Sequence, residues 1–398
     1  MLRFPRLAGL GESEIMRCLA RLRALTTLLI GLIWAGCAGG ALADEASLRD
    51  AVGLTAAAMW LNFKSPGLVL AVVRGEDTVV LGFGETAKGS KLEPNGRTLL
   101  RIGSVSKAFA GELLASLAAE GKVKLADAAA NFLPGVTLPV TDGRPITLVD
   151  LVTHSAGFPR DLPGEAPPGT NPYERFSWEN DKAYFASAKL AFVPGTAAAY
   201  SNVGFDLLGA ALAGAAGTSY AELLKTRITG PLGMRDTGLR LDEAQKARLM
   251  TGYDFEGNPM EPFEALEAQG ASGGVYSTAD DMVRFMRWHL DRKNPAGDSV
   301  RVIDHAVYLQ RDGLKMAVGF DEGGKSDAIG LAWLAMNPDG ARPFILQKTG
   351  GFQGFMSYMA FAPSRGVGVF VAVNQFNFGG FTQMAETANG LIGELAPR

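Results

Sequence analysis

The order of strand-like and helix-like segments along the chain is the feature that most constrains its fold. Near the N-terminal side, residues 68–73 and 78–83 are apolar and are joined by Arg-Gly-Glu-Asp, a pattern typical of a β-hairpin. The middle of the chain repeats apolar residues mainly at helical spacing. Strand-like segments return in the last third, at residues 315–320, 328–336, 344–348, 355–361 and 366–373. We therefore expect one discontinuous α+β domain: an antiparallel sheet flanked by terminal helices, with a mostly helical lobe inserted into it.

Helices are expected wherever apolar residues keep the helical spacing. These segments are residues 46–63, 108–117, 148–153, 205–215, 220–228, 279–290 and 387–395. Gly121 follows the second segment as a C-terminal stop signal, and Thr278 precedes the sixth as an N-cap. On this basis the sheet lobe takes about 44–125 and 300–398, and the helical lobe takes about 126–299. Residues 158–180 contain five prolines and predict a long loop or lid, a type of segment that often carries function.

The first 43 residues have the three-part organisation of a secretory signal peptide. An arginine-rich start precedes an apolar, uncharged stretch over residues 24–34, and the A-x-A site Ala41-Leu42-Ala43 follows. Translation from Met16 would give the shorter basic region that is typical of such peptides. We therefore predict export to the periplasm, cleavage after Ala43 and a mature domain over 44–398. Two alternatives stay open: an uncleaved segment that holds the protein at the inner membrane, and lipid attachment at Cys37.

Both cysteines, Cys18 and Cys37, lie in this predicted leader, so the mature chain would contain no thiol. This excludes a disulfide-based fold, a multi-cysteine zinc site and thiol catalysis. Loss of the leader removes five arginines and two glutamates and changes the net charge from −3 to −6. An acidic chain with no later basic stretch is a poor match for nucleic acid. The apolar content of 47% excludes intrinsic disorder, and no later apolar run is long enough for a membrane span.

Three motifs match known signatures by letter but lack the structural context that those signatures need. Residues 319–326 fit the phosphate-loop pattern, yet a strand-like segment follows where a helix should begin, which indicates a hairpin turn. Residues 82–87 resemble a dinucleotide fingerprint, but no helix follows them, and we interpret them as a strand end. Residues 270–274 fit the nucleophile elbow, with Asp304 and His305 downstream, but no buried strand precedes the serine.

The three histidines, His154, His289 and His305, are far apart in the sequence. They lack the i,i+4 spacing at which two histidines on one helix face bind a metal ion. We therefore predict no metal site. His154 directly follows a short predicted helix and is interpreted as a structural residue.

Ser104-Val105-Ser106-Lys107 forms an S-x-x-K motif at the start of a predicted helix. In a helix, the lysine lies one turn from the serine on the same face. A serine hydroxyl is too weak an acid to attack a carbonyl unaided and needs a base within hydrogen-bond reach. A lysine can be this base where burial or a neighbouring cation lowers its pKa toward neutrality. The motif alone is weak, because a surface Ser and Lys on an ordinary helix would match it equally well.

Two further motifs follow in a meaningful order. Tyr200-Ser201-Asn202 is the only Y-x-N in the chain and precedes a predicted helix, and Lys348-Thr349-Gly350 is the only K-T-G and ends a predicted strand. Serine penicillin-recognising enzymes carry S-x-x-K, then S-D-N, then K-T-G. Agreement of all three elements in order is far less probable by chance than any single match.

With these motifs the chain resembles the serine β-lactamase and penicillin-binding protein superfamily, on the class C branch, where a tyrosine opens the second motif. It is most similar to D-alanyl-D-alanine carboxypeptidase/endopeptidases of the AmpH type. The resemblance spans about residues 53–394. The shared stretches are residues 146–154, 199–208, 231–234, 272–278 and 347–351.

The resemblance implies a mechanism through an acyl-enzyme on Ser104. Lys107 and Tyr200 would share the proton transfers, with the pKa of the phenol lowered by Lys107 and Lys348. The backbone N–H groups of Ser104 and Gly351 would form the oxyanion hole. No metal or cofactor is implied.

The resemblance also implies the substrate contacts. Asn202 would hold the substrate amide. Lys348 and Thr349, with Gly350, would bind the C-terminal carboxylate of a D-Ala-D-Ala stem peptide of peptidoglycan. β-Lactams would act as acylating ligands at the same serine.

The chain departs from the class C pattern directly after K-T-G. Phe352 follows Gly351 at a place where class C β-lactamases carry small polar residues, so that the cleft would be narrowed or reshaped. Efficient β-lactam hydrolysis is therefore in doubt, while acylation by penicillin is still expected. Our main hypothesis is an exported serine DD-peptidase. The alternatives are a class C-like β-lactamase or serine esterase, and a penicillin-binding sensor without turnover.

Overall fold

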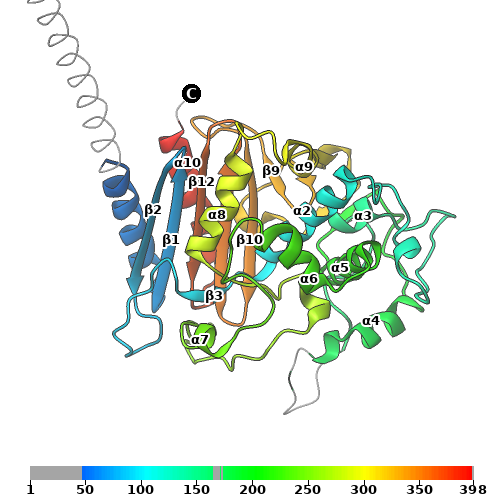
Figure 1. The fold of residues 1–398 in the computed structure, drawn as a ribbon, viewed down its shortest axis with the longest axis horizontal. Helices are drawn as coiled ribbons and strands as arrows, with labels where there is room; N and C mark the ends of the chain where they lie inside the picture. The colour runs from blue at the N-terminus through cyan, green and yellow to red at the C-terminus, as the bar shows by residue number, and fades with distance from the viewer. Residues whose placement is uncertain (1–46, 165–170, 172–173, 397–398) are drawn as a thin grey trace, which may run out of the picture. The chain divides into compact units, whose positions relative to one another are not determined.

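A computed structural model describes residues 47–164, 171 and 174–396 of the chain (Figure 1). Contacts divide the chain into two units, Met1–Ala51 and Val52–Arg398. The predicted signal peptide, its cleavage site and Cys37 lie outside the described residues; in the first unit, residues 47–51 are helical. All candidate site residues lie in the second unit.

An antiparallel sheet organises the second unit, and its strands within the described residues run in the order β2-β1-β12-β11-β10-β9-β8-β6. Their bounds are β1 Gly67–Arg74, β2 Asp77–Gly84, β6 Val307–Gln310, β8 Ala328–Gly330, β9 Leu334–Met336, β10 Ile345–Phe352, β11 Phe355–Ala362 and β12 Val367–Val373. β1 pairs with β12, so the N-terminal hairpin joins the C-terminal strands. The predicted discontinuous α+β fold is confirmed.

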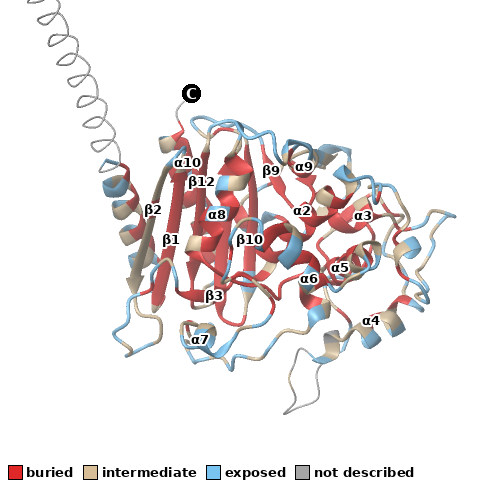
Figure 2. Cartoon of the chain, viewed as in Figure 1, coloured by how far each residue is buried: buried red, intermediate tan, exposed pale blue. Residues whose placement is uncertain are grey.

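Helices cover both faces of this sheet. α10 (Gly380–Leu395) packs on β11 and β12, where Tyr358 donates a hydrogen bond to Asn389 over 2.9 Å. On the other face, α8 (Ala279–Leu290) packs against β1 and β12. β11 and β12 are therefore buried along their whole length, whereas the edge strand β2 is mostly half-exposed (Figure 2). Burial on both faces explains why these strands are continuously apolar rather than alternating.

In the sequence, the remaining elements lie mainly between the N-terminal strands β1 and β2 and the C-terminal strands β6 to β12. Residues 52–63 are helical, and the named elements are β3 Leu99–Arg101, η1 Gly103–Val105, α2 Ser106–Ala119, η2 Ala129–Phe132, α3 Leu148–Val152, η3 Glu174–Phe176, α4 Trp178–Phe185, β4 Ala198–Ala199, α5 Asn202–Ala216, α6 Tyr220–Leu224, η4 Lys225–Thr229, α7 Glu243–Lys246, η5 Glu267–Gln269, β5 Tyr276–Thr278, α9 Asp298–Asp304, η6 Arg311–Gly313, β7 Ala317–Val318 and η7 Asp321–Gly323. α2 is buried along most of its length and packs against α5 and α9.

The predicted helices are present, and their local signals act as expected. The Thr278 side chain accepts the Asp281 N–H and caps α8, and Gly121 follows α2 at a positive φ of 72°. The predicted loop over 158–180 is interrupted by η3 and by the start of α4. α8 packs on the sheet although its residues fall within the range assigned to the helical lobe; the lobe boundaries stay a prediction.

No individual helix in the described part of the chain is long and apolar enough to cross a membrane, although the bent pair Asn202–Ala216 and Tyr220–Thr229 satisfies the length and composition criteria together. Residues 202–208 of this pair are buried apart from the first, which is half-buried. The apolar surface of α5 packs within the core cluster that also contains α2 residues.

Two predicted strands and one predicted hairpin turn differ from the structure. Residues 328–336 form two strands, β8 and β9, because the chain turns at Ala332 (φ +68°) and places Trp333 in the core. Residues 315–320 contribute only the short β7, which pairs in parallel with β4. Residues 319–326 are therefore no hairpin turn, since they connect strands of different sheets; they also open no helix, as expected.

Candidate active site

Ser104 lies in η1, the short turn directly before α2. This turn is pressed against β10, and glycine makes the close approach possible. A Cβ added at Gly350 would lie 2.0 Å from the Ile102 carbonyl oxygen, and one added at Gly103 would lie 2.5 Å from the Gly351 nitrogen. Only a residue without a side chain fits such distances. The glycine of K-T-G thus brings Gly351 beside the turn that carries Ser104.

Lys107 is fully buried in the first turn of α2 and reaches three oxygen atoms. Its Nζ lies 3.3 Å from Ser104 Oγ and 2.7 Å from Asn202 Oδ1. It also donates to the backbone carbonyl of Ser272. Ser272, the serine of the rejected nucleophile elbow, thus lies beside the site but contributes its carbonyl group there.

The protonation state of Lys107 follows from these surroundings. Burial and, next, the neighbouring Lys348 cation hold the pKa of Lys107 well below its ordinary value, while Asp206 opposes them. A neutral amine has two N–H groups and one lone pair. When the amide oxygen of Asn202 and the carbonyl of Ser272 accept the two N–H groups, the lone pair is directed toward Ser104. The arrangement suits a base for the serine hydroxyl, as predicted for S-x-x-K.

Tyr200 is positioned by the turn between β4 and α5. Ser201 caps α5, since its Oγ accepts the Gly204 N–H at 2.9 Å, and it donates to the Pro159 carbonyl at 2.6 Å. The Ser201 N–H donates to His154 Nδ1 at 3.0 Å. The His154 ring stacks on Tyr200 with centroids 4.4 Å apart. His154 is buried and holds the tyrosine in place, which confirms its interpretation as a structural residue.

Tyr200 lies among cations, but its pKa is not lowered. Its Oη is 3.4 Å from Lys348 Nζ, and the ring is 4.9 Å from Lys107 Nζ and 4.8 Å from the Arg160 guanidinium. Burial raises the pKa of Tyr200 above its ordinary value, and this effect exceeds the lowering by a hydrogen bond with Ser104 and by Arg160. The expected depressed pKa is therefore wrong. The residue is a neutral phenol that can donate a proton.

Lys348 and Thr349 lie on β10, in the part of the strand that is not paired with β9. β9 pairs with β10 only as far as Gln347, while β11 continues to Phe352. Burial, with a contribution from Arg160 and against Glu322, lowers the pKa of Lys348 to about 8. Lys348 thus keeps its charge through neutral pH, and the pairing leaves the strand edge from Lys348 onward without a partner strand in the described residues.

The Asn202 side chain, which is predicted to hold a substrate amide, contacts two groups of the protein itself. Its Oδ1 accepts from Lys107, and its Nδ2 donates to Asp161 Oδ1 at 2.8 Å. Its backbone N–H donates to the Arg160 carbonyl at 2.7 Å. Both ends of the side chain are therefore engaged in holding the lysine and the adjacent loop.

Three site residues were not predicted from the sequence. Arg160 and Asp161 belong to the proline-rich loop, where the sequence predicts a functional segment but singles out no residue. Glu322 belongs to the rejected phosphate-loop match; it lies 3.7 Å from Arg160 NH2 and accepts from Thr349 Oγ1 at 3.5 Å. No local motif marks these residues, because their proximity arises only from the fold.

Phe352 is the last residue of β10, and its side chain is half-buried. Its ring lies 4.9 Å from the Arg101 guanidinium carbon, and its edge is 3.6 Å from the Cβ position of Gly273. The ring therefore borders the Gly273 segment, next to the carbonyl that accepts from Lys107. This position is compatible with the predicted reshaping of the cleft.

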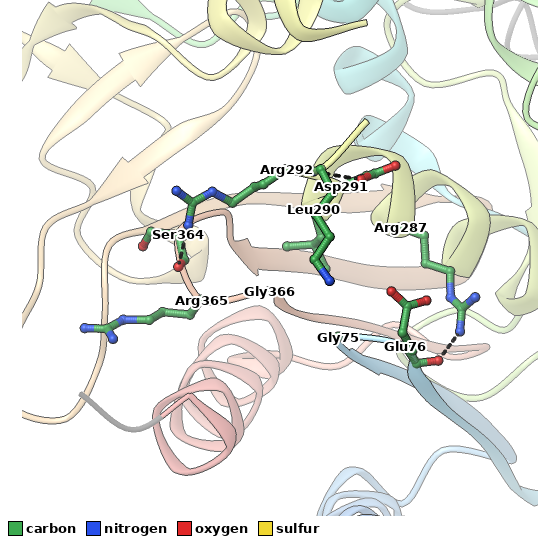
Figure 3. Close-up of a pocket in the computed structure, with 10 residues that line it drawn as sticks. Gly75, Glu76, Arg287, Leu290, Asp291, Arg292, Ser364, Arg365 and Gly366 are labelled. Carbon is green, nitrogen blue, oxygen red and sulfur yellow. Dashed lines mark hydrogen bonds between the residues drawn. The ribbon is translucent and has the colours of Figure 1, made fainter. Parts of the chain in front are cut away.

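A separate pocket of about 590 Å³ lies where the β1–β2 turn, the end of α8 and the β11–β12 turn meet (Figure 3). Arg287 donates to the Glu76 carbonyl, and Arg292 donates to the Ser364 carbonyl at 3.1 Å. None of the candidate site residues lines it. The chemistry described above is therefore not located in this pocket.

Comparison with known proteins gives the same family. The chain matches the Beta-lactamase family over residues 56–394. It is 39% identical over 339 residues to the D-alanyl-D-alanine-carboxypeptidase/endopeptidase AmpH of Escherichia coli K12, covering 83% of this chain and 85% of that protein. It is 28% identical over 351 residues to a β-lactamase of Pseudomonas fluorescens, covering 82% and 94%.

A solved structure also superimposes on this fold. It is the β-lactamase/D-alanine carboxypeptidase of Yersinia pestis in complex with citrate, at 37% identity and a TM-score of 0.80, covering 87% of this chain and 98% of that one. The family match over residues 56–394 includes every candidate site residue. The chain belongs to the β-lactamase family of serine hydrolases.

Proposed function

We propose that the protein is an exported serine DD-peptidase that acts through an acyl-enzyme on Ser104. It would remove the terminal D-alanine from peptidoglycan stem peptides or cleave the cross-links between them. The convergence of Ser104, Lys107, Tyr200 and Lys348 carries this proposal. These residues come from three distant parts of the chain. Lys107 and Tyr200 both contact Ser104, and Lys348 Nζ lies 3.4 Å from Tyr200 Oη. A similar protein that is named a D-alanyl-D-alanine-carboxypeptidase/endopeptidase supports the substrate class.

Acylation begins with the transfer of the Ser104 proton to the neutral amine of Lys107 as Oγ bonds to the carbonyl carbon. The N–H groups of Ser104 and Gly351 stabilise the oxyanion. The phenol of Tyr200 then gives its proton to the departing amine, and the C–N bond breaks. The products of this step are an ester on Ser104, a Lys107 ammonium and a Tyr200 phenolate that faces Lys348.

Deacylation uses the same groups in reverse. The Tyr200 phenolate takes a proton from water, and the hydroxide oxygen bonds to the acyl carbon. The ester C–O bond then breaks, and Lys107 returns its proton to Ser104 Oγ. Every group ends in its starting state, so no metal or cofactor is required for the balance.

Substrate recognition would use the open edge and the cations of the site. An extended peptide can pair with the backbone of β10 beyond Gln347, as peptides do when they add a strand to a sheet edge. A C-terminal carboxylate would then meet Lys348 and Thr349, with Arg160 close by. The amide bond one residue before that carboxylate would lie at Ser104, which is the geometry of a D-Ala-D-Ala terminus.

Export to the periplasm is part of the proposal and rests on the sequence of residues 1–43. A reporter that is active only after export, fused behind Ala43, should become active, and mass spectrometry of the mature chain should find Asp44 at its N-terminus. An N-terminus at Cys37 with a lipid would favour the lipoprotein alternative.

A class C-like β-lactamase is the second candidate, supported by the similarity to the P. fluorescens β-lactamase. The two functions share acylation and differ in the rate at which water releases a β-lactam. Phe352 beside the site favours slow release. Hydrolysis of simple esters alone would favour the esterase alternative, and stable acylation without any turnover would favour a sensor.

Purified muropeptides followed by mass spectrometry test the main proposal. Loss of a terminal D-Ala shows carboxypeptidase activity, and conversion of cross-linked dimers to monomers shows endopeptidase activity. Ser104→Ala should abolish both activities and covalent labelling by fluorescent penicillin, whereas the surface variant Ser364→Ala should retain them. Equal labelling of Ser104→Ala and the wild type would refute the nucleophile assignment.

A further inference from the structure

A second polar cluster is buried outside the active site, where α2, α8 and α9 meet. His289 is in the last turn of α8, Asp304 ends α9 and His305 follows it; Glu112 comes from α2. His289 and Asp304 are essentially inaccessible, Glu112 is 4% exposed, and His305 is half-buried. None of these side chains contributes to the mechanism above.

The ligand-type atoms of this cluster converge on one point. His289 Nδ1 lies 2.9 Å from His305 Nε2 and 3.7 Å from Asp304 Oδ2. One such atom from each of the three residues lies within 4.8 Å of the others. Ligand atoms about 2.0–2.1 Å from a tetrahedral zinc ion are separated by roughly 3.3 Å. The two observed distances lie on either side of that value, so small side-chain shifts would suffice.

The hydrogen bonding of the cluster is incomplete. Among the described residues, Asp304 Oδ1, Glu112 Oε2 and His289 Nε2 are buried and have no hydrogen-bond partner. Unsatisfied buried polar atoms are costly, and an ionised group without a partner costs more than a neutral one. An ion that binds between the imidazoles and Asp304 would satisfy the carboxylate and compensate its charge.

We propose that His289 Nδ1, His305 Nε2 and the Asp304 carboxylate form a binding site for a divalent transition-metal ion of the zinc class. Imidazole and carboxylate ligands in a set of three are typical of zinc. The half-exposed His305 marks the side from which the ion and a fourth ligand, water, would enter. The site ties the end of α8 to the end of α9.

The surroundings already resemble the support that metal-binding histidines have. Such a histidine donates its second ring N–H to a carboxylate, and a ligating carboxylate is itself hydrogen-bonded. Glu112 Oε2 faces His289 Nε2 at 3.7 Å, and Trp333 Nε1 donates to Asp304 Oδ2 at 2.8 Å. Glu112 would therefore orient His289, and Trp333 would orient Asp304.

Zinc alone is the probe for the test. The tag-free chain is stripped with a chelator and dialysed against buffered zinc, and the bound metal is measured by plasma mass spectrometry. We expect one zinc per chain and a melting temperature that rises with the concentration of free zinc. Asp304→Asn keeps the acceptor for Trp333 but loses the charge, and it should lose the bound zinc, as should His305→Gln. Glu112→Gln should weaken binding by about 10- to 100-fold.

Asp254→Asn is the matched control, because Asp254 is partly exposed, lies outside the cluster and should leave zinc binding unchanged. X-ray absorption of the wild-type chain keeps the proposal testable even where a buried variant fails to fold. The spectrum should show scattering from two imidazole ligands of the zinc. A wild-type chain that holds no zinc, zinc without imidazole ligands, or equal binding by all variants would overturn the proposal.

Discussion

At the scale of single residues, burial decides which group of the site carries a proton. Lys107 and Tyr200 have similar ordinary pKa values, but desolvation lowers the pKa of a lysine and raises that of a phenol. The structure shows both effects: the pKa of Lys107 is held well below and that of Tyr200 above its ordinary value. These opposite shifts support the proposed roles of Lys107 as the base and Tyr200 as the acid in acylation of Ser104.

Tyr200→Phe should reduce kcat/KM by about 10²- to 10⁴-fold, the usual contribution of one acid–base group. The ring and its stacking on His154 are retained, so folding should be unaffected. Steady-state kinetics on a D-Ala-D-Ala peptide and the melting temperature measure the two effects. Tyr308→Phe is the control, because it removes one tyrosine hydroxyl far from the site in the chain. Full activity of Tyr200→Phe would assign proton donation to another group.

The ionisation of Lys348 predicts a substrate-dependent pH profile. The pKa of this lysine is lowered to about 8, so its positive charge is lost as the pH rises through 8. A peptide with a free C-terminal carboxylate should show a rising KM above this pH, because it loses the partner of its negative charge. The same peptide with an amidated C-terminus should not. If KM rises in the same way above pH 8 for both peptides, Lys348 does not bind the carboxylate.

At the scale of elements, the site depends on the contact between η1 and β10. The strand and the turn belong to segments about 250 residues apart, and glycine at 103 and 350 lets their backbones meet. The Ser357 hydroxyl, opposite Gly350 on β11, donates to the Ile102 carbonyl at 2.8 Å and strengthens this contact. The position of Ser104 relative to Gly351 is thus set by sheet register.

Gly350→Ala should destabilise the fold by about 1–3 kcal/mol or more, because a methyl group would lie 2.0 Å from a backbone oxygen. The rate of acylation by penicillin should also decrease, because β10 must move away from the η1 turn that carries Ser104. Gly390→Ala is the matched control: this glycine is exposed in α10, with no atom within 4 Å of the added carbon, and the change should stabilise by about 0.4–1 kcal/mol. Urea unfolding curves and labelling rates test both; equal effects of the two variants would contradict the argument.

At the scale of the whole molecule, stability depends on carboxyl groups that the fold buries. Asp181 in α4 is inaccessible, and burial raises its pKa to about 7. Between about pH 4 and 7 the folded chain holds this proton while the unfolded chain has released it, so stability falls as the pH rises through that range. Above pH 7 the folded chain holds Asp181 as a buried carboxylate, and the full free-energy cost of burying this charge reduces stability.

Asp181→Asn should therefore raise the free energy of unfolding at pH 8 by as much as about 4 kcal/mol and change it little at pH 4. Urea unfolding at the two pH values measures the difference. Glu243→Gln, an exchange of an exposed acid, should leave the pH dependence unaltered. Parallel pH profiles for wild type and Asp181→Asn would show that this carboxyl group is not the cause.

Much of the fold was predictable because its signals are local. The cap at Thr278, the stop at Gly121 and the apolar runs of β11 and β12 act over a few residues. The break between β8 and β9 was not, because Trp333 is held in the core by Asp304, which lies 29 residues earlier. Arg160 and Glu322 were missed for the same reason: neither has a motif, and both meet Tyr200 or Thr349 only after folding.

Spacing and composition along the chain are sufficient to predict the candidate nucleophile, the order of the three motifs and the insertion of helices between the N-terminal and C-terminal strands. Three other features arise only on folding: the opposite pKa shifts of Lys107 and Tyr200, the hydrogen bond from Lys107 to Asn202, and the proximity of His289, Asp304 and His305. These depend on burial and on distances between remote segments. Neither quantity exists until the chain has packed.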